Sequence, residues 1–208
     1  MTAETANPDT EPERKARAAF RTAGGVLRMA DVLRAGIHRR TLYSMRDTGE
    51  VETLARGLYR LVGTAPLAHP DLVTVAAKVP HGVVYLVSAL AYHDLTTQIP
   101  HEVWLAVPRN SEPPRLDYPP LRVVRLSPAP YAAGIETHQL DGVGVKVYGR
   151  EKTLADCFKH RNDIGLDTVL EAVRRYKGQG RVDVDALLRY AAVCRVARVA
   201  RPYLEALL

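Results

Sequence analysis

The sequence has little that would direct the chain into a membrane, a secretory route or an oxidising compartment. Its longest apolar run, residues 82–90, is shorter than the roughly 18 residues that a spanning helix needs. Its first residues show neither the basic segment nor the apolar run of a signal peptide. The only two cysteines, Cys157 and Cys194, fall in apparent amphipathic helices, so we expect reduced core thiols. We therefore expect a cytoplasmic protein with no membrane partner.

The motifs of the common enzyme classes are lacking too. The chain holds no G-x-S-x-G, no P-loop, no H-E-x-x-H and no cysteine cluster. Lys152 and Asp156, with Glu151 beside them, have the spacing of helix-surface pairing residues. We expect no enzyme, no catalytic residues, no metal and no cofactor. Four histidines of the second half fall on different predicted elements: His93, His101, His138 and His160.

Positive charge is concentrated in one stretch of the chain. Residues 13–62 hold 11 Lys+Arg and 5 Asp+Glu, a net charge of +6. Residues 1–12 carry −3, and the other 146 residues carry 18 basic against 15 acidic groups, or +3. The acidic, polar residues 1–12 predict a disordered tail. A compact basic module of this kind favours the phosphate backbone of DNA as its partner.

The same stretch has the pattern of a winged helix-turn-helix. Gly36 supplies the left-handed turn between two short helices, and His38 stands near the N-cap of the second. Val26 and Leu27 form a short apolar link. Gly57 provides the positive φ that the hairpin turn of the wing needs. The predicted elements are helices over residues 13–23, 29–35 and 39–48, and wing strands over residues 51–54 and 58–62.

One face of the helix over residues 39–48 is a candidate for the major groove of DNA. Leu42 and Met45 form its buried side, and the opposite face is basic and polar, because arginine offers paired donors to guanine and hydroxyls reach bases or phosphates. Arg56, at the wing tip, is placed to touch phosphate or the minor groove. A solvated surface is the alternative for any basic face. The candidate DNA-binding residues are Arg28, Arg39, Arg40, Thr41, Tyr43, Ser44, Arg46, Arg56 and Arg60.

The second region predicts an α+β domain that ends in helices. Residues 64–70 contain two prolines and predict a linker, so we expect domains over residues 13–63 and 67–208. Asp141-Gly142 is a strong hairpin turn, and Ser88 is a candidate N-cap. Predicted strands cover residues 82–87, 102–107, 121–126, 135–140 and 143–148; predicted helices cover residues 71–78, 89–95, 151–159, 167–176, 184–195 and 197–207. The fold class is thus α+β, a winged helix-turn-helix followed by a mixed α/β domain.

Three segments in this order resemble a known family. They are AGIHRRTLYSMRDTGEVETLARGLYRL (residues 35–61), VYLVSALAYHDLT (residues 84–96) and VKVYGREKTLADCFKHRNDIG (residues 145–165). Together they resemble the AbiEi-type antitoxins of bacterial type IV toxin–antitoxin operons. The resemblance runs over nearly the whole chain, from Leu27 to the C-terminal helices.

This resemblance implies an antitoxin that also represses its own operon. The N-terminal winged helix would bind double-stranded promoter DNA, usually at inverted repeats. The second domain would neutralise a nucleotidyltransferase-like toxin, with or without a lasting complex. Exposed basic helix faces are candidates for docking the partner, although a solvated surface is the commoner fate of such groups. These candidates are Lys159, Arg161, Arg174, Arg175 and Lys177.

Two other functions stay open at this point. A winged-helix transcriptional regulator whose second domain senses a small ligand would need a pocket with converging polar groups, which the sequence does not show. A nuclease or a nucleotidyl-transfer enzyme would need clustered carboxylates that hold a metal, and the sequence shows no such cluster.

Overall fold

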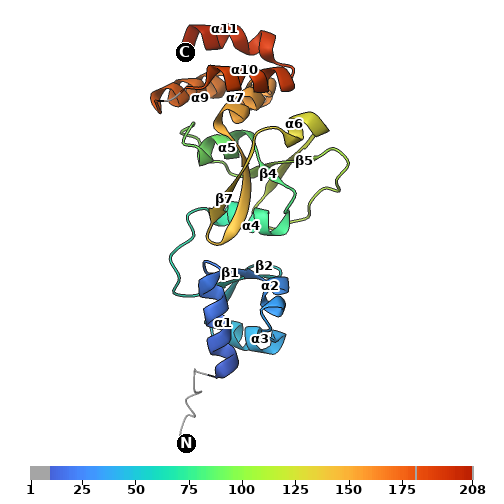
Figure 1. Ribbon diagram of the computed structural model, residues 1–208, viewed down its shortest axis with the longest axis vertical. Helices are drawn as coiled ribbons and strands as arrows, with labels where there is room; N and C mark the ends of the chain where they lie inside the picture. The colour runs from blue at the N-terminus through green and yellow to red at the C-terminus, as the bar shows by residue number, and fades with distance from the viewer. Residues whose placement is uncertain (1–9, 181, 208) are drawn as a thin grey trace, which may run out of the picture. The chain divides into compact units, whose positions relative to one another are not determined.

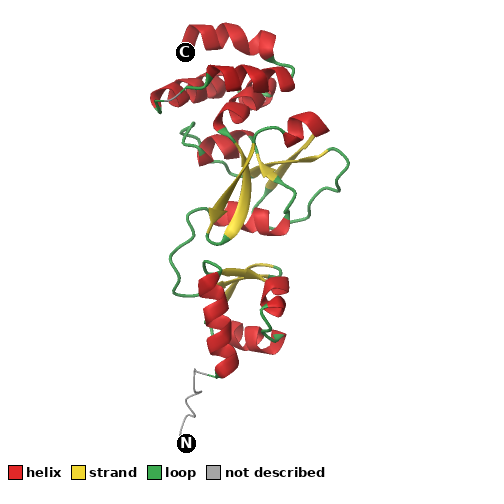
Figure 2. Cartoon of the chain, in the orientation of Figure 1, coloured by secondary structure: helices red, strands yellow, loops and turns green. Residues whose placement is uncertain are grey.

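The computed structural model describes residues 10–180 and 182–207, which form an α+β structure as the sequence predicts (Figure 2). Most of the expected acidic tail, residues 1–9, lies outside the described residues. The chain divides into two compact units: the first extends to Ala77 and includes Gln139–Gly144, and the second comprises Lys78–His138 and the chain from Val145 onward. The domain boundary at residues 64–70 stays a prediction. Among the described helices, none is long and apolar enough to cross a membrane.

The first unit contains the predicted winged helix-turn-helix (Figure 1). The first helix begins at Glu11 because the backbone N–H of Thr10 donates to the Glu13 carboxylate at 3.3 Å, which closes the helix start, and Pro12 fits the first turn. The elements are α1 (Glu11–Thr22), β1 (Val26–Arg28), α2 (Met29–Arg34), α3 (Arg39–Asp47), β2 (Val51–Ala55), β3 (Leu58–Leu61) and α4 (Pro70–Lys78).

A three-stranded antiparallel sheet of order β1-β3-β2 packs against α1, α2 and α3. Val26 and Leu27, expected as a link, form β1, and Val26 pairs with Arg60 of β3. Three residues are too short for a periodic pattern, so this strand exists only through its pairing. The buried core of the module brings α1, α2, α3 and the sheet together: Ala16, Phe20, Leu27, Val32, Ile37, Leu42, Met45, Val51, Tyr59 and Leu61.

The second unit is built on a five-stranded mixed sheet of order β6-β5-β4-β8-β7. The pairs β5–β6 and β4–β8 are parallel, and β4–β5 is antiparallel. Its strands are β4 (Val83–Val84), β5 (Val103–Pro108), β6 (Leu121–Leu126), β7 (Ile135–Leu140) and β8 (Val143–Tyr148). Its helices are α5 (Leu86–Tyr92), α6 (Pro128–Ala132), α7 (Arg150–Lys159), α8 (Arg161–Ile164), α9 (Leu166–Gly178), α10 (Val184–Val193) and α11 (Ala197–Leu207).

Helix α7 lies at the centre of the second unit (Figure 1). It contacts α5, α9, α10 and α11, and residues 152–158 of the helix are all buried. The core around it includes Leu154, Phe158, Val173 and Leu187. Residues 152–158 therefore have no solvated face, and this position decides the environment of the polar residues among them.

Two local predictions at the start of the second unit are wrong. The strand expected over residues 82–87 stops at Val84, because Leu86 takes a left-handed φ of 41° and turns the chain into α5. Ser88 is not an N-cap: Tyr85 is, and Ser88 lies buried within the helix. Its hydroxyl accepts a hydrogen bond from the Trp104 N–H at 2.9 Å, which ties α5 to β5.

Candidate nucleic-acid interface and a polar pocket

Helix α3 is the predicted recognition helix, and its start is capped as expected. The Nδ1 atom of His38 accepts a hydrogen bond from the backbone N–H of Arg40 at 3.1 Å, which satisfies one of the donors that a helix start leaves unpaired. Leu42 and Met45 are fully buried. Burial of this side fixes the rotation of the helix and therefore decides which side chains face outward.

The outward face of α3 gathers four of the predicted DNA-binding residues. Arg39, Arg40, Tyr43 and Ser44 are exposed, and Thr41 is half-buried beside them. Within residues 10–180 and 182–207, the guanidinium groups of Arg39 and Arg40 make no ion pair. Donors without internal partners are available to an external acceptor, and two adjacent arginines supply the paired donors that suit guanine or phosphate.

Arg46 belongs to the same helix but is already engaged. It forms an ion pair with Asp47 at 2.7 Å, and its guanidinium carbon lies 4.9 Å from the centroid of the Tyr43 ring. Asp47 therefore neutralises part of the positive charge at the C-terminal end of α3. Contact between Arg46 and a phosphate would first require this pair to open.

The wing places one further arginine outward and engages another. Arg56 is exposed at the hairpin tip, where Gly57 has a φ of 74° as the turn requires. Arg60 donates to Glu52 at 2.8 Å and to the carbonyl oxygens of Thr64 and Ala65. Arg60 therefore fastens the wing to the segment that follows it.

Arg28, the remaining candidate, is half-buried, and its guanidinium donates to the carbonyl oxygen of Ala76 at 3.4 Å. The nine candidate residues thus separate by geometry. Arg39, Arg40 and Arg56 are exposed and make no ion pair within the described part of the chain, whereas Arg28 and Arg60 are bonded to other groups of the first unit.

The five basic residues proposed for partner docking in the second unit also differ in their surroundings. Arg161 donates to the Phe158 carbonyl oxygen at 3.1 Å, Arg175 pairs with Glu171 at 2.8 Å, and Lys177 donates to the Leu207 carbonyl oxygen at 2.9 Å. Lys159 and Arg174 are exposed and form no ion pair within the described part of the chain. These two side chains are the ones available to a partner.

The surface pairing expected for Lys152 and Asp156 is wrong, because both side chains are buried. Their relative exposures are 0% and 1%, and the Lys152 ammonium forms an ion pair with the Asp156 carboxylate. Cys194 donates to the second carboxylate oxygen at 3.1 Å, and the ammonium lies 4.2 Å from the centroid of the Tyr148 ring. Burial raises the pKa of Asp156, and the Lys152 ammonium opposes this rise. Cys157 and Cys194 are both buried free thiols, as expected.

Two of the histidines that the sequence leaves scattered lie close together in the fold. The ring centroids of His93 and His138 are 6.4 Å apart. His93 Nε2 lies 2.8 Å from the Tyr148 carbonyl oxygen, and burial lowers the pKa of His93. His138 Nε2 lies 3.2 Å from Glu136. Across the described residues, no group of three or more His, Cys, Asp or Glu side chains is arranged to hold a metal.

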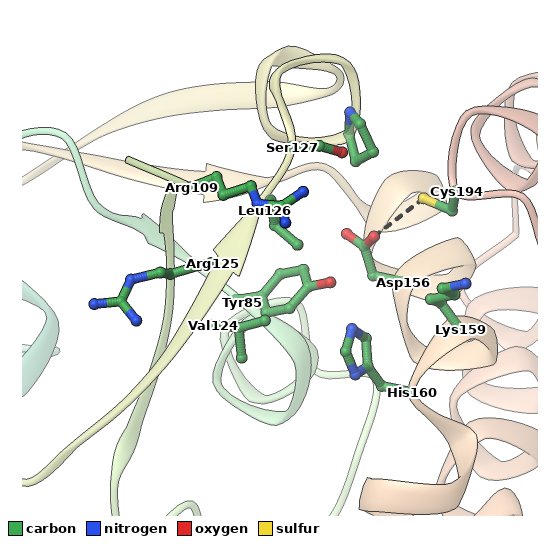
Figure 3. Close-up of a pocket in the computed structure, with 11 residues that line it drawn as sticks. Tyr85, Arg109, Val124, Arg125, Leu126, Ser127, Asp156, Lys159, His160 and Cys194 are labelled. Atoms are coloured by element: carbon green, nitrogen blue, oxygen red, sulfur yellow. Dashed lines mark hydrogen bonds between the residues drawn. The ribbon is translucent and has the colours of Figure 1, made fainter. Parts of the chain in front are cut away.

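A polar pocket lies in the second unit (Figure 3). The end of β6 and helix α6 form one side of it, and helix α7 and the end of α10 form the other. Its volume is about 330 Å³. Tyr85, Arg109, Asp156, His160 and Cys194 are among its lining residues. The sequence alone does not indicate this convergence of polar groups, because the residues come from separate elements and no local spacing connects them.

Two comparisons with known proteins match this chain, one over the winged helix and one over nearly its whole length. Residues 14–62 match the family model described as "Transcriptional regulator, AbiEi antitoxin", which confirms the predicted resemblance for the winged helix. The chain is also similar to a solved structure, the RV2827C protein from Mycobacterium tuberculosis, with 15% identity and a TM-score of 0.53. This match covers 98% of the present chain and 85% of the other, and at such identity it shows a shared fold alone. No curated protein matches the sequence.

Proposed function

We propose that this chain, whose winged helix is that of the AbiEi family of antitoxins and transcriptional regulators, represses its own operon and neutralises a nucleotidyltransferase-like toxin. The observation that carries the DNA-binding half is the outward face of α3. It presents Arg39 and Arg40, which make no ion pair to any residue that the structure describes, and the tip of the wing carries Arg56. An exposed, unpaired basic face on a recognition helix is what major-groove binding requires.

The geometry supports a division of labour among these residues. Arg39 and Arg40 would contact base edges or the phosphates that flank them, with the hydroxyls of Tyr43 and Ser44 as further donors. Arg56 would contact phosphate or the minor groove. Thr41 is half-buried, and Arg46, Arg28 and Arg60 are already bonded within the first unit, so these four would contribute less. Promoter sites would be inverted repeats, as the family resemblance implies.

The test of this proposal is a gel-shift titration of the operon's own promoter with the full chain. Replacing Arg39 and Arg40 together with Ala removes two unpaired donors and should weaken binding at least about tenfold. A matched control replaces Arg189 and Arg198 with Ala, because both are exposed, lie on α10 and α11, and remove the same charge. Equal titration curves for the two double variants would refute the assignment of α3 as the recognition helix.

Repression and neutralisation should be separable by substitution. The Arg39/Arg40 double variant should lose promoter repression in a reporter strain and keep full rescue of cells from the toxin. Arg174→Glu, on the exposed side of α9, should weaken rescue and keep repression if this basic face docks the toxin. Arg189→Glu is its matched control. Full rescue by Arg174→Glu would show that this face of α9 does not dock the toxin.

We further propose that neutralisation comes from binding and involves no reaction carried out by the second unit. Replacing His93 or His138 with Ala should therefore leave rescue intact at matched protein levels. Loss of rescue in a folded variant that still binds the toxin would instead indicate catalysis.

The second candidate function is a ligand-responsive regulator, and the polar pocket of the second unit favours it. Two results together would support this alternative. The chain would leave promoter DNA when a small molecule is added, and it would not change the survival of cells that express the toxin.

A further inference from the structure

The polar pocket contains a tyrosine hydroxyl that makes no hydrogen bond to another described residue. Tyr85 is 1% exposed, and its hydroxyl points into the cavity, toward the space between Asp156 and His160 (Figure 3). Its ring is held edge-on against Tyr148 and His160, at centroid distances of 5.6 and 5.8 Å. No side chain or carbonyl within the described residues bonds to this hydroxyl. The hydroxyl is not among the fully buried polar atoms that lack a partner, so it is reached from the cavity and is available to bond a molecule that enters the pocket.

Two exposed cations line the pocket in addition to the Asp156 carboxylate. Arg109 and Lys159 line the pocket and make no ion pair within the described ranges of the chain. Figure 3 shows Arg109 extending over Leu126 toward the cavity, whereas Arg125 extends away from it. Asp156 also lines the pocket, but Lys152 and Cys194 already engage its two oxygens. The charges at the pocket wall that no described residue balances are therefore those of Arg109 and Lys159.

A third cation borders an adjoining cavity of about 610 Å³, which shares Arg109, Ser127 and Lys159 with the pocket. This cation, Arg195, has a φ of 57°, in the left-handed region that usually takes glycine at the end of a helix. The Val196 N–H bonds to the Ala191 carbonyl oxygen at 2.8 Å and closes this helix end. An arginine kept in a strained position at the rim of a cavity indicates that its side chain is used.

The remaining walls are apolar. Val124, Leu126 and Pro130 line the pocket together with the Tyr85 ring, and the hydroxyl of Ser127 lies at one edge. The cavity has the size and the mixed lining of a small-molecule site, with a few polar groups among apolar ones. The body of a suitable ligand is therefore apolar and flat, and its polar end is an anion.

We propose that this pocket binds an aromatic phosphate monoester, with the phosphate among Arg109, Lys159 and Arg195. A phosphate monoester carries a charge of about −1.5 to −2 and three strong acceptor oxygens, which matches three cations better than a carboxylate does. The hydroxyls of Tyr85 and Ser127 bond its oxygens, and the aromatic body lies against Val124 and Leu126. The site does not involve the DNA-binding face, so the inference is independent of the proposed promoter binding, although it shares Lys159 with the candidate partner-docking residues.

The test is isothermal titration calorimetry of the full chain at low salt, with phenyl phosphate and adenosine 5′-monophosphate as probes. At least one of the two should bind in the submillimolar range. Its neutral counterpart, phenol or adenosine, should bind at least about tenfold more weakly, because the charged contacts are the strong ones. No binding of either phosphate up to several millimolar would overturn the proposal. Equal binding of the neutral counterpart would do so as well, since it would show an apolar cavity only.

Three variants test the roles of individual residues. Arg109→Ala should weaken binding about tenfold or more, and Tyr85→Phe about two- to tenfold through loss of one hydrogen bond. Arg195→Gly relieves the left-handed strain, so its Tm should be equal to or above that of the parent while binding falls. Arg189→Ala, exposed on α10, is the charge-matched control and should bind like the parent.

Unchanged affinity in both Arg109→Ala and Arg195→Gly would place the phosphate elsewhere and overturn the assignment. Promoter binding by Arg109→Ala should equal that of the parent chain. This second measurement separates a failure of the pocket proposal from a failure of the DNA-binding proposal.

Discussion

Lys152→Met should destabilise the second unit in a manner that depends on pH. Methionine preserves most of the volume and the aliphatic stem of lysine, so the loss from packing is small, below about 1.5 kcal/mol. The larger effect is electrostatic, because Asp156 keeps its carboxylate at 1% exposure with no ammonium beside it. Removing one partner of a buried ion pair costs about 3–5 kcal/mol of unfolding free energy.

The dependence on pH follows from the carboxyl of Asp156. Burial already raises the pKa of Asp156 above its usual value of 3.8, and removal of Lys152 takes away the group that opposes this rise. A carboxyl with a raised pKa in the folded state contributes stability that is present below the unfolded pKa and is lost as pH rises through the folded pKa. Lys152→Met should therefore be closest to the parent chain near pH 4 and furthest below it near pH 8.

Trp104 provides the assay, because it is the only tryptophan of the chain and lies on β5 in the second unit. Urea unfolding followed by its fluorescence reports on that unit. Adding Asp156→Asn to Lys152→Met removes the uncompensated charge and should recover most of the loss at about pH 8. A constant difference between variant and parent from about pH 4 to pH 8 would refute this reasoning, as would a failure of the second substitution to recover stability.

Three further outcomes follow from the structure. Arg56→Ala should weaken binding to all DNA sequences alike and lower the salt slope of log K by about one, measured by filter binding at several salt concentrations. A changed base preference would show instead that the wing reads bases. Ser88→Ala leaves the Trp104 N–H without its acceptor and should cost about 1–3 kcal/mol in urea unfolding; no loss would mean that another group takes this bond. Gly36→Ala places a side chain on a residue with a φ of 72° and should lower the free energy of unfolding by about 1–2 kcal/mol. Thermal unfolding followed by far-UV circular dichroism measures this loss, and an unchanged Tm would contradict it.

The amino-acid sequence by itself determined those features whose signal is local. The cap at His38, the left-handed turn at Gly36 and the buried pair Leu42 and Met45 all lie within a few residues of each other, and all stand in the structure as predicted. The hairpin around Asp141-Gly142 has the predicted strand bounds for the same reason. The exposed basic face of α3 follows directly, because burial of one side of a short helix decides what the other side presents.

Only the tertiary structure decided the features that depend on contacts between distant segments. Lys152 and Asp156 have the spacing of a surface pair, but residues 152–158 of α7 are covered by neighbouring helices, so the pair is buried. Ser88 has the chemistry of a cap, yet it bonds to a strand sixteen residues away. The pocket around Tyr85 combines β6, α6, α7 and the end of α10. A periodic pattern reports whether one side of an element is buried, and it does not report which elements will cover the other side.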